Sequence, residues 1–164
     1  MSETIFLLAQ TGLTAALAAW MFTGARDNIL YPAMNENIVR MLMQFDLIAE
    51  EYPEDFAKVA HRRVENPRLI RIAFIGIVIS ETIATLVLAV GTIALLGALF
   101  GTTEPDTAQA IALLGAFLFT MNWAGFLVGG NHYAIWYCHQ GSQHTHFALV
   151  IWGTLSMIFL ALPA

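Results

Sequence analysis

One ionisable side chain, Glu81, stands alone in a long apolar stretch, because no other Asp, Glu, Lys or Arg occurs from residue 72 to residue 103. A charged carboxylate at the centre of a membrane costs on the order of 3 kcal/mol and by default marks a proton or ion site. The alternative is a protonated Glu81 that links helices by hydrogen bonding to Asn122 or a threonine. Asn122, Thr14 and Thr154 are expected at a similar depth, so the sequence predicts a polar cluster inside a helical bundle.

A second group of reactive side chains lies near the C-terminus. Four histidines and one cysteine fall within fifteen positions: His132, Cys138, His139, His144 and His146. A single interfacial helix ended by Gly141 would place His132, Trp136 and His139 on one face, at i, i+4 and i+7. Imidazole is the commonest metal ligand, so these histidines raise the possibility of a copper, zinc or haem site. No HxxxH or HxxH pair occurs, and we therefore expect no metal site and assign no cofactor.

Long apolar segments must position these side chains. The composition is 58% hydrophobic, above the roughly 45–50% of soluble domains, which argues against a soluble bundle. About 20 apolar residues are needed to cross a bilayer as a helix. The sequence predicts an all-α, integral membrane bundle of four transmembrane helices with short interfacial amphipathic helices, in one membrane domain over residues 1–164. The expected spans are residues 5–23, 69–100, 108–128 and 147–162.

The first apolar block has an alternative interpretation as a cleaved signal sequence, because Ala16-Leu17-Ala18 resembles a cleavage site. The residues before the block carry no Lys or Arg, whereas a signal peptide has a positively charged start. We therefore expect this block to be retained as a span. The single Cys138 excludes an intrachain disulfide.

The connection over residues 24–68 is predicted to be partly helical. From residue 35 to residue 51 the apolar side chains follow a helical stripe, Pro53 opens a second short helix, and Asn66-Pro67 precedes the next span. These helices would lie at the headgroup level or dock a partner protein. On the second span, small residues recur every fourth position and predict a helix-packing face of Gly76, Ser80 and Ala84.

Charge distribution predicts the orientation. All seven Lys and Arg residues lie in or beside residues 24–68, and basic residues near span ends stay in the cytoplasm. This rule places residues 24–68 and 129–146 in the cytoplasm and both termini outside. The net charge of −5, without a basic stripe, makes nucleic acid an unexpected partner.

Scattered positions along nearly the whole chain resemble the DUF2165 family of small bacterial integral membrane proteins. They are Gly129-Gly130, Trp136, Gly141 and the terminal Leu162-Pro163, Phe22 with Asp27, the series Asn35, Val39, Leu42 and Asp46, and Pro67 with Glu81-Thr82. The resemblance implies a four-span protein of the bacterial inner membrane and brings no activity or cofactor. Asn131 and His132 stand where that family has Glu and Trp, so no acidic role carries over to Asn131. Family members also carry basic residues at the N-terminus and between the second and third spans, which would reverse the orientation above.

The sequence is compatible with three functions. The favoured one is a non-catalytic accessory or assembly subunit of a larger membrane complex, in contact with the lipid bilayer and with other membrane protein subunits. The second is a membrane-embedded redox, quinone- or metal-binding protein that uses Glu81, Asn122 and the face of His132, Trp136 and His139. The third is a small transporter or channel subunit with Glu81 as its ion site. We expect no enzymatic activity, because no recognisable catalytic set is present.

Overall fold

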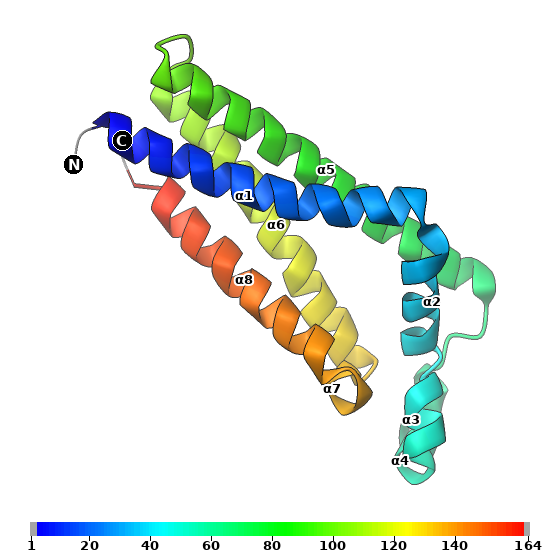
Figure 1. Cartoon of the computed structure of the whole chain (residues 1–164). Helices are drawn as coiled ribbons and strands as arrows, with labels where there is room; N and C mark the ends of the chain where they lie inside the picture. Colours follow the sequence, from blue (N-terminus) through cyan, green and yellow to red (C-terminus); the bar gives the residue numbers. More distant parts are fainter. Residues whose placement is uncertain (1–2, 163–164) are drawn as a thin grey trace.

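The computed structural model describes residues 3–162, and within that range every regular element is helical. Four long helices form a bundle, and short helices connect them at one end (Figure 1). The elements are α1 (Glu3–Leu30), α2 (Pro32–Met43), α3 (Asp46–Glu51), α4 (Pro53–Val59), the 3-10 turn η1 (Ala60–Arg62), α5 (Pro67–Leu99), α6 (Pro105–His132), α7 (Ile135–Cys138) and α8 (Gln140–Leu160).

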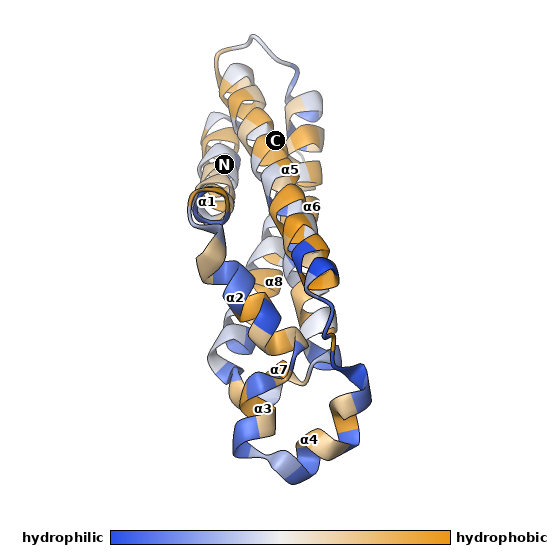
Figure 2. Ribbon diagram, turned by 90° about the vertical axis from the view of Figure 1, so that its right-hand side faces the viewer, coloured by the Kyte–Doolittle hydropathy of each residue, from blue (hydrophilic) through white to orange (hydrophobic). Residues whose placement is uncertain are grey.

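Three of the helices, α1, α5 and α6, are long and apolar enough to cross a membrane. The all-α membrane class is therefore confirmed, whereas the expectation of four spans exceeds what the helices show. The difference lies in α8, whose first seven residues, 140–146, are largely polar. Its apolar part begins at Phe147 and covers roughly 21 Å at 1.5 Å per residue, short of the ~30 Å hydrocarbon core. Hydropathy colouring shows apolar long helices and a polar α2 to α4 region (Figure 2).

α5 lies in the middle of the bundle, packing against α1 and α6, and α8 packs against α6. Glycine lets α5 and α6 approach closely: a Cβ at Gly91 would lie 2.7 Å from the Cα of Ala112. The packing face predicted from small residues differs from position to position, and its Ser80 reaches α6 through a hydrogen bond to Asn122. Ala84 is fully buried, but Gly76 and Ser80 are exposed, and a Cβ at Gly76 would meet only open space. Close packing occurs farther along α5 than the spacing indicated.

The helix predicted over residues 35–51 is divided in two. Phe45 adopts a left-handed φ of 56° and separates α2 from α3. This conformation costs a residue with a Cβ roughly 1–2 kcal/mol, and the buried Phe45 ring offsets that cost by packing 5.6 Å from the Tyr133 ring, centroid to centroid. The predicted helix start at Pro53 is confirmed. So is the one at Asn66-Pro67, where the Asn66 side chain caps α5 by accepting a hydrogen bond from the Arg68 N–H.

At one end of the bundle, two glutamines tie three helices together. The fully buried Gln10 of α1 donates to the carbonyl of Phe159, and Gln109 of α6 donates to Gln10 Oε1 at 3.0 Å and to the carbonyl of Leu162 at 3.1 Å. The amides therefore satisfy backbone carbonyls that the end of α8 leaves free. From this end α1 and α8 diverge, and their far ends are bridged by α2, α3 and α7 (Figure 1).

Candidate functional site

A chain of polar side chains connects α5 to α1 and α2, and its members on α5 and α1 are buried. Glu81 lies roughly 20 Å along α5 from its first residue and is 5% exposed. Its Oε2 accepts a hydrogen bond of 2.7 Å from Asn28 Nδ2, and Asn28 Oδ1 accepts one of 2.5 Å from Asn35 Nδ2. Asn28 is also buried. Glu81 therefore has an amide partner on α1, and neither Asn122 nor a threonine side chain bonds its carboxyl group.

This polar chain borders a cavity of about 530 Å³ at the end of the bundle where α1 and α8 have separated. Residues of α1, α2, α5, α6 and α8 line it, and the segment from Tyr133 to Ile135 contributes as well. Glu81 is the only Asp, Glu, Lys or Arg in the lining. Most other lining positions are apolar or glycine, so the site combines one carboxyl group with an apolar lining, as small-molecule sites do.

The wall opposite α1 is aromatic and holds two polar atoms without partners. The Trp123 ring stacks on the His146 imidazole, with centroids 5.6 Å apart, and Phe126 packs against both. Among the described residues, Trp123 Nε1 and His146 Nδ1 are buried without any hydrogen bond. Leaving such an atom unpaired costs about 1–3 kcal/mol, so both atoms are candidates to bond a molecule in the cavity after small side-chain rotations.

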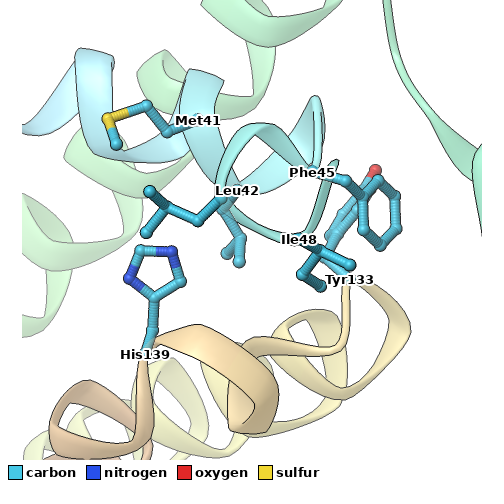
Figure 3. Close-up of a pocket in the computed structure, with 7 residues that line it drawn as sticks. Met41, Leu42, Phe45, Ile48, Tyr133 and His139 are labelled. Carbon is cyan, nitrogen blue, oxygen red and sulfur yellow. The ribbon is translucent and has the colours of Figure 1, made fainter. Parts of the chain in front are cut away.

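The predicted single face of His132, Trp136 and His139 does not form. α6 ends at His132, Ala134 takes a left-handed φ of 51°, and His139 separates α7 from α8. His132 and Trp136 are exposed, whereas His139 is partly buried and lines the cavity. Figure 3 is a close-up of a smaller neighbouring pocket that shares Leu42, Tyr133 and His139 with this cavity, and it shows His139 pointing toward Leu42 of α2. Of the three, only His139 therefore joins the site with Glu81.

The remaining predicted polar residues are not part of the cavity lining. Asn122 Oδ1 accepts a hydrogen bond of 2.6 Å from Ser80 Oγ, which joins α5 to α6 beside the cavity lining. Thr14 donates within its own helix to the Gln10 carbonyl, and Thr154 is exposed on α8. Glu81 and Asn122 thus lie at neighbouring levels but in separate hydrogen-bond groups. The predicted single polar cluster is wrong for these residues.

A polar contact outside the apolar helices holds α4 against α7. Tyr137 Oη donates to Asp55 Oδ2 at 2.5 Å, and Lys58 Nζ contacts Asp55 Oδ1 at 2.6 Å. The Lys58 ammonium, followed by the Tyr137 hydroxyl, lowers the pKa of Asp55 below its ordinary value, and the same bond to Asp55 raises the pKa of Tyr137. Burial raises the pKa of the nearby Cys138 thiol, with a smaller contribution from Glu51. Cys138 is therefore a poor thiolate nucleophile.

The sequence did not single out Asn28 or Trp123, and it grouped His146 with the other histidines and not with Glu81. Asn28 lies beyond the apolar block that ends at residue 23, but α1 continues as a helix to Leu30. Trp123 and His146 belong to different helices, so no spacing along the chain links them. Asn28 lies five residues after the end of the first apolar block, and a helix can extend beyond its hydrophobic segment. Its position was therefore the one signal in the sequence that could have placed it in the site.

The long apolar helices define a multi-pass integral membrane protein whose helices line a cavity at one end. The chain belongs to the DUF2165 family, described as predicted small integral membrane proteins, whose family model matches residues 6–163. No curated protein and no solved structure matches the chain.

Proposed function

We propose that the protein is a non-catalytic membrane subunit that binds an amphipathic small molecule in the cavity bordered by Glu81. The observation that carries this proposal is the combination on one cavity of a buried carboxyl group and the unpartnered nitrogens of Trp123 and His146. A bound molecule with polar and apolar parts would supply the missing hydrogen bonds and cover the apolar lining.

Size and composition support this proposal. Small-molecule sites commonly occupy about 300–1,000 Å³ and combine an apolar lining with a few convergent polar groups. The cavity of about 530 Å³ falls inside that range. Side chains from five long or amphipathic helices meet there, including Asn35 and Leu42 of α2. The amphipathic connection thus covers the bundle's own cavity, which weakens its interpretation as a docking surface for a partner.

A cavity-filling substitution tests the proposal. Ala73 of α5 lines the cavity, and Ala73→Trp should occupy much of its volume. Ile79→Trp adds an indole to an exposed position of the same helix and is the matched control. Native mass spectrometry of protein purified in a mild detergent should show a co-purified small molecule on the wild type and on Ile79→Trp, with little on Ala73→Trp. Equal occupancy of all three proteins would reject the proposal.

A role as accessory subunit of a larger complex is compatible with this binding function. Trp136 is 46% exposed at the end of the molecule that carries α2 to α4, and exposed tryptophan is enriched at contact sites between proteins and at membrane interfaces. Co-purification of the same partner by the wild type and its loss from Trp136→Ala would support the accessory role. Retention of the partner by this variant would place the contact elsewhere.

We further propose a location in the bacterial inner membrane, with α8 as a fourth span and the loop end in the cytoplasm. One end of the bundle holds the start of α1, the turn between α5 and α6, and the end of α8 (Figure 1). The basic residues lie in or beside the connection at the other end, which supports its cytoplasmic placement.

A further inference from the structure

Resting on the proposed function, we propose that the cavity selects a hydrophobic organic cation, an ammonium or phosphonium group carried on an apolar body. Three features point to this class of ligand: the charge of the lining, the aromatic wall and the free oxygen of Glu81. The first and third features both belong to Glu81 of α5, and the aromatic wall includes side chains of α6.

The charge of the lining favours a positive ligand. Glu81 is its only Asp, Glu, Lys or Arg, and the other ionisable side chains are Tyr133, His139 and His146. The basic side chains nearest in sequence to lining residues are engaged elsewhere, since Arg26 pairs with Asp27, Arg40 with Asp46 and Arg71 with Glu36. An anionic ligand would find no fixed cation. A cation would meet a carboxyl group in surroundings that screen charge weakly.

Aromatic rings enclose the same space. Phe74, Trp123, Phe126 and Tyr133 all line the cavity, and the Trp123 and Phe126 ring centroids are 5.5 Å apart. The faces of such rings attract cations, tryptophan most strongly, and aromatic cages recognise quaternary ammonium groups. An apolar body on the cation would fill the rest of the lining, which consists largely of aliphatic side chains and glycine.

Glu81 has one oxygen available for a ligand. Among residues 3–162, Oε2 accepts the bond from Asn28, and Oε1 has no hydrogen bond. The Asn28 amide fixes the orientation of the carboxyl group, so the second oxygen has a defined position beside the cavity. This leaves Glu81 positioned to contact a cation without losing its structural bond to α1.

Binding of tetraphenylphosphonium tests the proposal, with triphenylphosphine oxide as an uncharged molecule with the same phenyl groups. Isothermal titration of the full-length protein in a neutral detergent should give saturable phosphonium binding of about one per chain, with the oxide bound at least about tenfold more weakly. Glu81→Gln should reduce phosphonium affinity by at least about tenfold and leave oxide binding unchanged. Asn122→Ala, an intramembrane polar residue outside the lining, is the control and should match the wild type.

A competition experiment with two lipids distinguishes a lipid headgroup from a free cation as the natural ligand. Phosphatidylethanolamine and phosphatidylglycerol are added separately to the micelles before titration. Competition by phosphatidylethanolamine alone would identify an amine headgroup as the resident cation, and no competition by either lipid would identify a free lipophilic cation. Both results support cation selection.

The outcomes that overturn cation selection differ from those that overturn the binding function. Equal affinity for the oxide and the phosphonium, unaffected by Glu81→Gln, would overturn cation selection while leaving a ligand-binding cavity in place. If Glu81→Gln fails to fold, Phe126→Leu takes its place as the test variant. Cation selection then requires that Phe126→Leu lowers the affinity for the phosphonium and leaves the affinity for the oxide unchanged. No binding of either compound overturns cation selection, and equal co-purification by wild type and Ala73→Trp overturns the binding function as well.

Discussion

At the scale of single residues, Glu81 combines a structural hydrogen bond with an unused oxygen. Glu81→Gln should preserve the fold, because the amide keeps an acceptor for Asn28 Nδ2. Glu81→Leu removes the interhelical bond and should lower stability by about 0.6–2 kcal/mol, the range for polar contacts between membrane helices. Thermal unfolding in detergent measures both effects. If Glu81→Gln lowered the stability as much as Glu81→Leu, this account of Glu81 would be contradicted.

At the scale of helices, α5 packs closely at one glycine and leaves another in open space. Gly91→Ala places a Cβ 2.7 Å from the Cα of Ala112, a backbone atom that cannot move aside. We expect a loss of about 1–3 kcal/mol from overpacking. Gly76→Ala, on the same helix with nothing within 4 Å, is the control and should be neutral or slightly stabilising. Thermal unfolding checks the pair, and equal melting temperatures would reject the observed α5 to α6 packing.

The contact between α4 and α7 should make stability depend on pH. The folded pKa of Asp55 is lowered, so its contribution is present above the ordinary value of 3.8 and is lost as pH falls through the lower folded pKa. The folded pKa of Tyr137 is raised, so its contribution is present below 10.0 and is lost as pH rises through the higher folded pKa.

Tyr137→Phe should therefore flatten the pH dependence of the melting temperature in the acidic and the alkaline window, because it removes one partner of the bond to Asp55. Tyr52→Phe is the control, since Tyr52 touches the Tyr137 ring at 4.8 Å, centroid to centroid, and provides no hydroxyl to Asp55. Identical profiles for wild type and Tyr137→Phe would show that this bond is absent in solution.

The helices were predictable where local chemistry decides them. Proline begins α4 and α5, where the N–H that it lacks would have no partner within the helix. Hydropathy located α5 and α6 to within a few residues. The break at Phe45 was not predictable, because tertiary packing against Tyr133 stabilises a conformation that phenylalanine itself disfavours. Of the candidate site, Glu81 was identified from its isolation in the sequence. Its partner Asn28 and the cavity depend on how far the helices extend and diverge.

At the scale of the whole molecule, two reporters test both the orientation and the fourth span. A reporter active only outside the cytoplasm should be active when fused after Ala164 and silent when inserted near Tyr52, because the basic residues keep that connection inside. The reverse pair of results would invert the orientation and keep four spans. Silence at both positions would show that α8 does not cross the membrane, and would leave the three helices that meet the length and apolarity of a span.

The divergence of α1 from α8 also has a consequence for the surrounding lipid. The helices are held together at the Gln10 end and spread at the cavity end (Figure 1), so the protein is tapered and displaces more area from one leaflet than from the other. Such a shape is accommodated best where the leaflet on the wide side is stretched. We expect the protein to prefer membranes that bulge toward its α2 to α4 end, and to change the local curvature of a flat bilayer into which it is inserted.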